Sequence, residues 1–338
     1  MLISIIVPAY NVENYLERCV SAIIKQTSQD YEVVIIDDGS TDSTGEIADK
    51  ISKNNDKIRV IHQENKGLGG ARNTGIVAAR GDYLFFLDSD DYIRGNTVEI
   101  IKYYLEQKKL DILVFDFCND ETENNLVVDD INYREINNKE YLIFGGPSAC
   151  NKVYRKEIFV NQSIYFPEKT LYEDIATIPN TACFARKIGI IDAQLYYYVF
   201  RQDSIISSPN LKRIPEVLRG FNRVLEFYKK HGLIKEYNEE LEFLAILHVF
   251  YCSCQRIMIA RGGKDDYKKI EKYMYDNFPD YEHNVYLKRH DVINKYDIDE
   301  YFYLLLVNKK YRIAKWKKYP LLEQKRFLRR MINKVKEI

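Results

Sequence analysis

Short runs of apolar residues alternate with amphipathic stretches along the first 118 residues of this chain. The runs predict five buried β-strands, at residues 3–7, 33–36, 58–61, 83–87 and 112–117. Nearly continuous apolar runs are typical of strands that are covered on both faces, so we expect a largely parallel sheet. Alternating strands and helices predict an α/β fold whose ligands bind at the carboxyl ends of the strands.

The stretches between the strands have the spacing of amphipathic helices. The first helix is predicted by apolar residues at helical intervals, namely Leu16, Val20, Ile23 and Ile24. The segment Ser43-Thr44-Gly45-Glu46 has the form of a capping box and predicts the start of the second helix. A third helix is predicted to begin near Gly67 and to end at Gly81, which would serve as its C-terminal cap.

The pattern changes after residue 118. Residues 118–138 are polar and acidic and predict a connecting loop, whereas residues 139–208 regain apolar runs that can complete the sheet. The part that follows Pro215 predicts three helices, at 217–228, 241–259 and 267–274.

These patterns place a domain boundary near Pro209. We expect an α/β domain at residues 1–210, with halves at 1–118 and 119–210. A helical C-terminal region is expected at residues 211–338.

The composition is that of an ordinary globular protein, but the charge is unevenly distributed. Fifty Lys and Arg residues balance fifty Asp and Glu residues, which argues against a general nucleic-acid-binding protein. Residues 309–338, the basic tail, hold twelve basic and two acidic residues, a net charge of +10. The preceding 308 residues therefore carry about −10, because the whole chain is neutral.

The basic tail interleaves its charges with aromatic and aliphatic residues, including Trp316 and Phe327. Basic helices with such an apolar face lie on anionic membranes, which would make a lipid-linked substrate plausible. A second interpretation is equally open, in which the tail folds onto the acidic body of its own chain.

The six cysteines contain no Cys-x-x-Cys pair, so neither a zinc site nor a disulfide framework is indicated. The N-terminal segment reaches Pro8 and Asn11 too soon for a signal sequence. No segment contains the eighteen or so uncharged apolar residues that a membrane span needs. We expect a cytoplasmic protein, with peripheral membrane attachment if the basic tail binds lipid.

Two acidic clusters follow predicted strands, Asp37-Asp38-Gly39-Ser40 after the second and Asp88-Ser89-Asp90-Asp91 after the fourth. Carboxylates at neighbouring strand ends converge on one edge of the sheet, where a cation or N–H donors can neutralise them. For Ser40, Thr41 and Asp42, capping of the next helix is the better interpretation.

These clusters belong to a set of segments that resembles the family 2 inverting glycosyltransferases with the GT-A fold. The matching segments of the first 118 residues are Val7-Pro8-Ala9-Tyr10-Asn11, Asp37-Asp38-Gly39-Ser40-Thr41-Asp42, Asn65-Lys66-Gly67, Gly70-Ala71-Arg72-Asn73-Thr74-Gly75 and Leu87-Asp88-Ser89-Asp90-Asp91. A looser match covers the acceptor half, at 151–157, Glu173-Asp174, and Tyr196-Tyr197-Tyr198 with Arg201.

The resemblance implies a nucleotide-sugar site built from Pro8, Ala9, Tyr10, Asn11, Asp37, Asp38, Lys66, Arg72, Asp88, Ser89 and Arg201. Asp38, and less surely Asp37, would accept a hydrogen bond from the base N3–H, which selects uracil-like bases. Arg72 would meet the base or the diphosphate, and Asp88 would hold the ribose hydroxyls. Asp90 would bind Mg²⁺ or Mn²⁺ between the two phosphates, an arrangement usual for these cations.

The resemblance also implies that Asp174, with Glu173 beside it, takes the proton of the attacking hydroxyl. The alternative is that this pair caps the helix that follows, and the two roles are compatible. Tyr197 is a candidate for stacking on a sugar ring, although neighbouring tyrosines of a strand point to opposite faces.

The function implied is metal-assisted, inverting transfer of a sugar from a nucleotide-sugar donor, expected to carry UDP, to a hydroxyl acceptor. The acceptor would be a glycan or a lipid-linked saccharide in surface polysaccharide synthesis. The alternative is a catalytically silent scaffold subunit that binds a nucleotide sugar or a glycan. The oligomeric state stays open. A dinucleotide-binding oxidoreductase is disfavoured because Pro8-Ala9-Tyr10-Asn11 stands where its glycine-rich turn would be.

Overall fold

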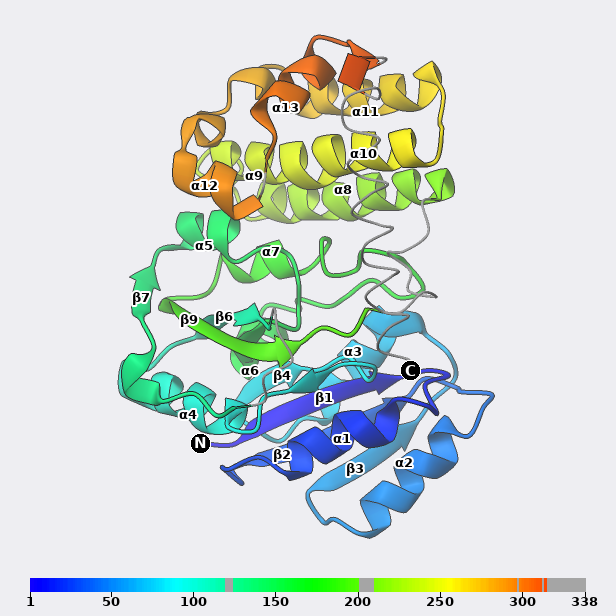
Figure 1. The fold of residues 1–338 in the computed structure, drawn as a ribbon, viewed down its shortest axis with the longest axis vertical. Helices are drawn as coiled ribbons and strands as arrows, with labels where there is room; N and C mark the ends of the chain where they lie inside the picture. Colours follow the sequence, from blue (N-terminus) through cyan, green and yellow to red (C-terminus); the bar gives the residue numbers. More distant parts are fainter. Residues whose placement is uncertain (119–123, 201–209, 297, 312, 315–338) are drawn as a thin grey trace. The chain divides into compact units, whose positions relative to one another are not determined.

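The computed structural model describes residues 1–118, 124–200, 210–296, 298–311 and 313–314 (Figure 1). The chain divides into two compact units. The first unit comprises Met1–Tyr141 with Gly145–Val199, and the second comprises Leu142–Phe144 with Phe200–Ile338. Arg201 and most of the basic tail lie outside the described residues, so the predictions made for them stay predictions.

The described residues of the first unit form one nine-stranded sheet with the order β3-β2-β1-β4-β8-β6-β9-β5, and β7 pairs with β9 outside this path. The strands are β1 (Ile3–Ala9), β2 (Tyr31–Asp37), β3 (Ile58–His62), β4 (Tyr83–Phe86), β5 (Tyr92–Ile93), β6 (Ile112–Phe117), β7 (Tyr133–Ile136), β8 (Lys152–Arg155) and β9 (Ile188–Tyr197). All five predicted strands are present.

The sheet is mixed, with most of its strands in one direction. Strands β3, β2, β1 and β4 are parallel neighbours, and β6 is parallel to β9. By contrast, β8 is antiparallel to both β4 and β6, and β9 is antiparallel to β5 and β7. The predicted α/β sheet is confirmed, and its antiparallel strands were not predicted because an apolar run does not reveal the direction of its strand.

Helices cover both faces of the parallel part. In this unit the helices are α1 (Leu16–Ile24), α2 (Thr44–Lys53), α3 (Gly67–Ala78), α4 (Thr97–Lys108), α5 (Asn138–Phe144, which ends in the second unit), α6 (Lys156–Val160) and α7 (Ile178–Thr181). Ile5 and Ile35 share a core with α1 and α4, whereas Val34 shares a second core with α3. A Cβ on Gly75 would lie 2.3 Å from Ile6, so this glycine lets α3 pack closely on β1.

Of three local predictions, one was right in part and two were wrong. Helix α2 begins at Thr44 with Ser43 as its N-cap, as predicted, but the Ser43 side chain makes no capping bond; Asp42 Oδ1 accepts a hydrogen bond from the Thr44 amide at 3.0 Å. Helix α3 ends at Ala78, before Gly81, since Ala79 is already extended. The polar stretch 118–138 contains β7, whose sequence Tyr-Arg-Glu-Ile did not indicate a buried strand.

The second unit is helical. Its elements are α8 (Ile214–Lys230), α9 (Asn238–Leu244), the π-helical segment η4 (Ala245–Tyr251), α10 (Cys252–Ile259), α11 (Lys264–Asn277), α12 (His290–Tyr296) and α13 (Glu300–Val307). These helices confirm the three that were predicted. By length and composition, the stretch Asn238–Ile259 could cross a membrane, a feature that the sequence analysis did not identify. It is 72% buried within the protein, as expected for a core helix.

Candidate functional site

Two acidic turns lie at the carboxyl ends of β2 and β4, on either side of β1. The first turn comprises Asp37-Asp38-Gly39-Ser40, and the second turn comprises Asp88-Ser89-Asp90-Asp91. Strand β1 pairs with both strands in parallel, so the two turns emerge at the same edge of the sheet. The predicted convergence of these carboxylates is therefore present.

In the first turn, the Asp37 carboxylate is engaged by protein donors at both oxygens. Oδ1 accepts a hydrogen bond from the Ser40 amide at 3.0 Å, and Oδ2 lies 2.8 Å from His62 Nδ1. Burial opposes ionisation, but these bonds hold the pKa of Asp37 below its ordinary value. Both Asp37 oxygens thus hold the turn together, and the expectation that Asp37 helps to bind the base stays a prediction.

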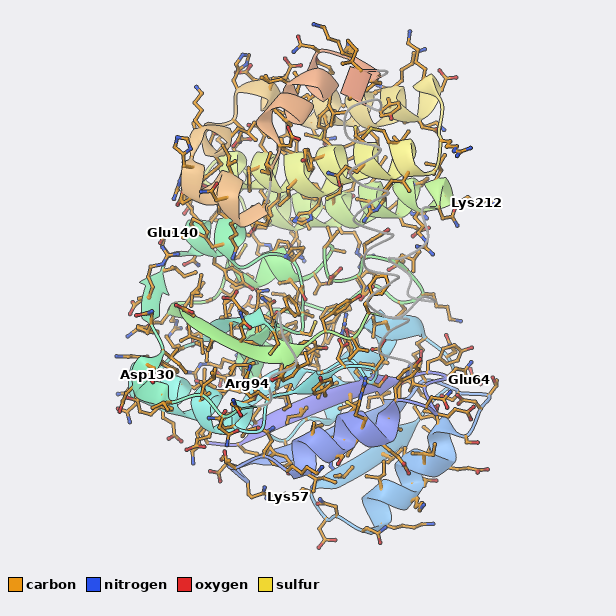
Figure 2. All side chains as sticks on the ribbon, in the orientation of Figure 1. Lys57, Glu64, Arg94, Asp130, Glu140 and Lys212 are labelled. Atoms are coloured by element: carbon orange, nitrogen blue, oxygen red, sulfur yellow. The ribbon has the colours of Figure 1, made fainter. Side chains whose placement is uncertain are left out.

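Asp38 is 2% exposed and keeps one oxygen for a ligand. Its Oδ1 accepts hydrogen bonds from Gln63 Nε2 at 2.6 Å and from the Lys66 amide at 2.8 Å, in the loop that also carries Glu64 (Figure 2). Among the described residues, no donor reaches Oδ2. Lys66 thus acts here through its backbone, and its side chain is exposed.

The segment that follows the buried residues Pro8 and Ala9 exposes an aromatic ring beside the first turn. Tyr10 is 48% exposed. Asn11 has a left-handed φ of 51°, and its Oδ1 accepts a hydrogen bond from the Thr41 amide at 2.8 Å. This bond fixes the segment next to Asp38, where the Tyr10 ring can stack on a planar base.

The second turn concentrates negative charge. Asp88 and Asp90 are half-buried, whereas Ser89 and Asp91 are buried. Burial, followed by the charges of Asp88 and Asp90, raises the pKa of Asp91 to about 8. Asp88 has a cationic partner, namely Arg72 Nη2 at 2.9 Å.

Arg72 of α3 is an ion-pair bridge rather than an open ligand group. Its guanidinium is 3% exposed, contacts Glu173 Oε1 through Nη1 at 2.6 Å, and lies over the Phe166 ring at 5.3 Å. Burial opposes its charge, but Asp88 and Glu173 raise the pKa of Arg72 above its usual value. Arg72 thus pairs with two carboxylates here, and its expected contact with base or diphosphate stays a prediction.

Glu173 and Asp174 differ although they are adjacent. Glu173 is paired with Arg72, whereas burial and then the Glu173 charge raise the pKa of Asp174 to about 7. The Arg72 bridge connects the residue before Asp174 to Asp88 of the second turn. Asp174 thus has the pKa expected of a general base near neutral pH.

The structure supports the alternative, capping interpretation only through the backbone, because the N-cap of α7 is Thr177, which makes no side-chain capping bond. The Asp174 carbonyl accepts a hydrogen bond from the amide of Ile178, the first residue of α7, at 2.9 Å, and Asp174 Oδ1 accepts one from the Ile175 amide at 2.8 Å. Tyr172 immediately before the pair has a left-handed φ of 61°. Such a conformation is strained for a bulky residue, and strain of this kind clusters at functional sites.

The second turn suits a divalent cation that is held jointly by the protein and by phosphate oxygens. Within the described residues, no three His, Cys, Asp or Glu side chains converge on one point, so a cation held by protein alone is not supported. The turn does offer hard carboxylate oxygens close together, since the charges of Asp88 and Asp90 add to burial in raising the pKa of Asp91. Asp90 can therefore contribute a ligand to Mg²⁺ or Mn²⁺, with phosphate oxygens completing the shell.

Tyr197 does not form a sugar platform. It is 4% exposed, its ring stacks on Tyr92 with centroids 4.5 Å apart, and Arg94 lies over it at 5.4 Å. Two residues of the site, Gln63 and Tyr196, were given no role from the sequence. Gln63 stands in no recognised motif and Tyr196 only in the looser match, and each reaches its turn through a contact distant in sequence.

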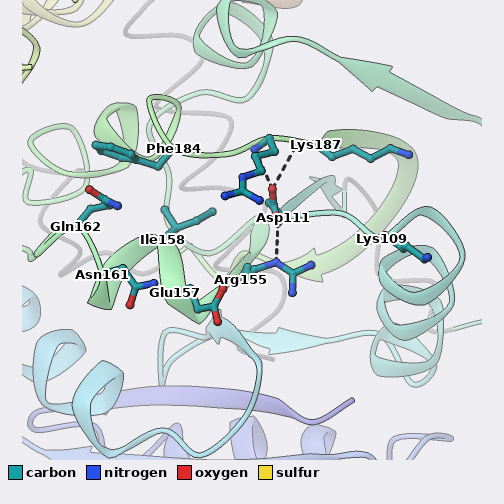
Figure 3. A pocket seen from close by; sticks show the side chains of 10 residues that line it. Lys109, Asp111, Arg155, Glu157, Ile158, Asn161, Gln162, Phe184 and Lys187 are labelled. Atoms are coloured by element: carbon teal, nitrogen blue, oxygen red, sulfur yellow. Dashed lines mark hydrogen bonds and ion pairs between the residues drawn. The ribbon is translucent and has the colours of Figure 1, made fainter. Parts of the chain in front are cut away.

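A separate pocket of about 450 Å³ lies at the opposite edge of the sheet (Figure 3). Asp111 precedes β6 at this pocket and accepts hydrogen bonds from Arg155 Nε at 2.6 Å and the Arg186 amide at 2.8 Å. Because it lies at the amino ends of β6 and β9, the pocket is remote from both acidic turns.

Sequence comparison identifies related proteins. The profile described as "Glycosyl transferase family 2" matches residues 4–161. The chain is 31% identical to glycosyltransferase GlyG of Streptococcus pneumoniae serotype 4 over 271 residues, which covers 72% of this chain and 89% of GlyG. It is 37% identical to chondroitin synthase of Pasteurella multocida over 140 residues, which is 41% of this chain but 14% of that synthase.

Solved structures share the fold. Staphylococcus aureus TarS 1–349, in complex with UDP-GlcNAc, superposes with a TM-score of 0.69 at 20% identity and covers 95% of this chain and 92% of its own. The mannosyltransferase PcManGT of Pyrobaculum calidifontis, in complex with GDP-Man and Mn²⁺, gives a TM-score of 0.53 at 14% identity, with coverage of 94% and 86%.

Proposed function

Because this chain belongs to glycosyl transferase family 2, we propose that it transfers a sugar from a uridine diphosphate donor to a hydroxyl group of a saccharide acceptor. One observation carries the proposal. The Arg72 guanidinium joins Asp88 of the second turn to Glu173, and the next residue in the chain is Asp174, whose pKa is about 7.

Asp38 supports a uridine donor. Its Oδ2 can accept the N3–H of uracil, and cytosine has no hydrogen at that position. The fold alone does not select the base, because the solved relatives TarS and PcManGT are complexes with a uridine and a guanosine nucleotide sugar, respectively. Within this chain, Asp38 and the exposed Tyr10 ring are the groups suited to hold the base.

The second turn has groups suited to bind the ribose and the diphosphate of the donor. Asp88 can accept hydrogen bonds from the ribose hydroxyls through the oxygen that Arg72 leaves open, and the buried Ser89 lies between it and Asp90. Asp90 would hold the divalent cation together with the phosphates. When bound, Mg²⁺ or Mn²⁺ would neutralise the charge that develops on the departing nucleoside diphosphate.

Asp174 supplies the base in a single displacement. Its ionised carboxylate takes the proton of the acceptor hydroxyl while that oxygen bonds to the anomeric carbon of the sugar. The bond from this carbon to the phosphate oxygen breaks on the opposite face, so an α-linked donor gives a β-linked product. Glu173 keeps Arg72 in place and sustains the raised pKa of Asp174.

The acceptor is proposed to be a glycan or lipid-linked saccharide of a surface polysaccharide, assembled on the cytoplasmic side of the membrane. The partial match to a chondroitin synthase supports a polymeric acceptor. Membrane attachment through the basic tail stays a prediction, because residues 315–338 lie outside the described part of the chain.

The direct test is titration of the purified protein with UDP, CDP, GDP and their sugar conjugates, with and without Mn²⁺, by calorimetry. We expect Mn²⁺-dependent binding of UDP, with one UDP-sugar tighter than the rest. If no nucleotide shows metal-linked binding, the proposed donor site is wrong.

A further inference from the structure

The second acidic turn is held from two sides, by Arg18 and by Tyr196, neither of which was given a role in the site from the sequence. From α1, Arg18 Nη2 donates a hydrogen bond to the Asp90 carbonyl at 2.6 Å. From β9, the Tyr196 hydroxyl donates to Asp91 Oδ2 at 2.6 Å and accepts from the Asp88 amide at 3.2 Å. The turn itself is tight, since the Asp91 amide donates to the Asp88 carbonyl at 3.0 Å.

The Tyr196 side chain is held in place by the protein core as well as by the second turn. It is fully buried, and its ring packs edge-on against Phe117 with centroids 5.5 Å apart. The hydroxyl uses its hydrogen on one end of the turn and a lone pair on the other, so it sets the spacing between residues 88 and 91. The second Asp91 oxygen accepts a hydrogen bond from the Val199 amide at 2.7 Å, beyond the end of β9.

Arg18 is exposed but is also held in place. Its guanidinium lies 5.1 Å from the centre of the Tyr92 ring, which stacks in turn on Tyr197 at 4.5 Å. Tyr92 and Tyr197 are paired across β5 and β9. A cation above an aromatic face is attracted by the ring, and this contact aims Arg18 at the Asp90 carbonyl.

We propose that Tyr196 and Arg18 are positioning residues that hold Asp90 in the orientation needed to bind a divalent cation together with a nucleoside diphosphate. The inference rests on the proposed function. Asp88 and Asp90 are like charges in one tight turn, so an unsupported turn would let them separate and would lose the geometry of the ligand. Groups that contact a metal ligand, rather than the metal, and fix its orientation typically contribute 10- to 100-fold in metal affinity.

The test is the Mn²⁺ concentration that half-saturates UDP binding, measured by calorimetry on the full chain. Tyr196→Phe removes only the hydroxyl, and we expect it to raise this concentration about 10- to 100-fold. Arg18→Met, at an exposed position, is expected to raise it about 10-fold, and excess Mn²⁺ should restore transfer in both variants. The matched control is Tyr154→Phe, a buried tyrosine of β8 whose hydroxyl bonds the Ala149 carbonyl instead.

Three outcomes would contradict the positioning roles of Tyr196 and Arg18. If either folded variant keeps a half-saturating concentration within twofold of wild type, its positioning role is wrong. A rise in Tyr154→Phe equal to that in Tyr196→Phe would show a general effect of a lost buried hydroxyl, and would also overturn the role. If the wild-type protein shows no Mn²⁺-linked UDP binding, the proposed function fails, and this inference fails with it.

Discussion

The two acidic turns occupy equivalent places in the fold but neutralise their charges in opposite ways. In the first turn, the Asp37 carboxylate receives protein hydrogen bonds and its pKa is lowered. In the second turn, Asp91 is crowded by two further carboxylates and its pKa is raised to about 8. In the first turn, protein donors already stabilise the Asp37 carboxylate. The second turn gains stability from an added positive charge.

This difference assigns separate tasks to similar sequences. A carboxylate that is already held by N–H donors can recognise another N–H donor, as Asp38 is proposed to do with a base. A turn with excess negative charge suits a cation and, through it, a diphosphate. Four substitutions test this difference between the turns. The first two should abolish transfer, and the last two should have smaller effects.

The largest effect is expected for Asp90→Ala. Loss of the proposed cation ligand removes several kcal/mol of transition-state stabilisation, or about 10³- to 10⁴-fold in transfer rate. The measurement is sugar transfer at saturating donor, together with UDP binding with and without Mn²⁺. Asp56→Ala, at an exposed position before β3, serves as control and should leave both unchanged. Unaltered Mn²⁺ dependence in Asp90→Ala would remove the cation from the second turn.

Asp174→Asn should lower the transfer rate by about 10³-fold and leave Mn²⁺-dependent UDP binding intact, because only proton removal is lost. In the wild-type protein the active form is the ionised carboxylate. Since the pKa of Asp174 is about 7, the rate should rise with pH through that value and then level off. Equal loss of donor binding and transfer in the variant would contradict the assignment. Full activity would favour the alternative in which the pair only caps α7.

Asp38→Asn tests the first turn. The amide can still accept the bonds from Gln63 and Lys66, but its NH₂ group would face the uracil N3–H. A hydrogen bond to a charged group contributes about 1.5–3 kcal/mol, so UDP affinity should fall about 10- to 100-fold. Affinity for CDP should fall less, because cytosine N3 is an acceptor. An unchanged ratio of UDP to CDP affinity would show that Asp38 does not read the base.

The smallest effect is expected for His62→Ala, which affects stability rather than transfer. Hydrogen bonds to Asp37 and Asp49 raise the pKa of His62, so its contribution is complete below its ordinary value near 6.5 and is lost as pH rises through the folded value. For a partly exposed pair we expect about 0.2–1 kcal/mol at pH 6 and less at pH 9, measured by urea unfolding. The same loss at both pH values would contradict a role for the protonated imidazole.

The sequence predicted the fold best where local pattern decides it. The five apolar runs correspond to β1, β2, β3, β4 and β6. The strands that were not predicted, such as the two-residue β5 and the polar β7, exist through their pairing with β9. Strand direction in the second half of the sheet likewise depends on which distant strand lies alongside, and local periodicity carries no such information.

The candidate site shows the same difference between features set by local sequence and features set by contacts distant in sequence. Asp38, Asp88 and Asp90 were identified because each stands in a short segment at a strand end. The contacts of Tyr196 with Asp91 and of Arg18 with Asp90 connect residues 105 and 72 positions apart. Arg72 was identified, but its partners were not, since its burial between two carboxylates depends on how the segment around Glu173 folds back onto α3.

The Arg72 bridge limits how this enzyme can be recombined with its relatives. Asp88 and Arg72 belong to the first 118 residues, whereas Glu173 belongs to the half expected to select the acceptor. A chimera that joins these halves from two parents inherits one buried guanidinium and needs both carboxylates around it. Exchange of acceptor specificity by domain grafting therefore requires that positions 72, 88 and 173 be transplanted as one unit.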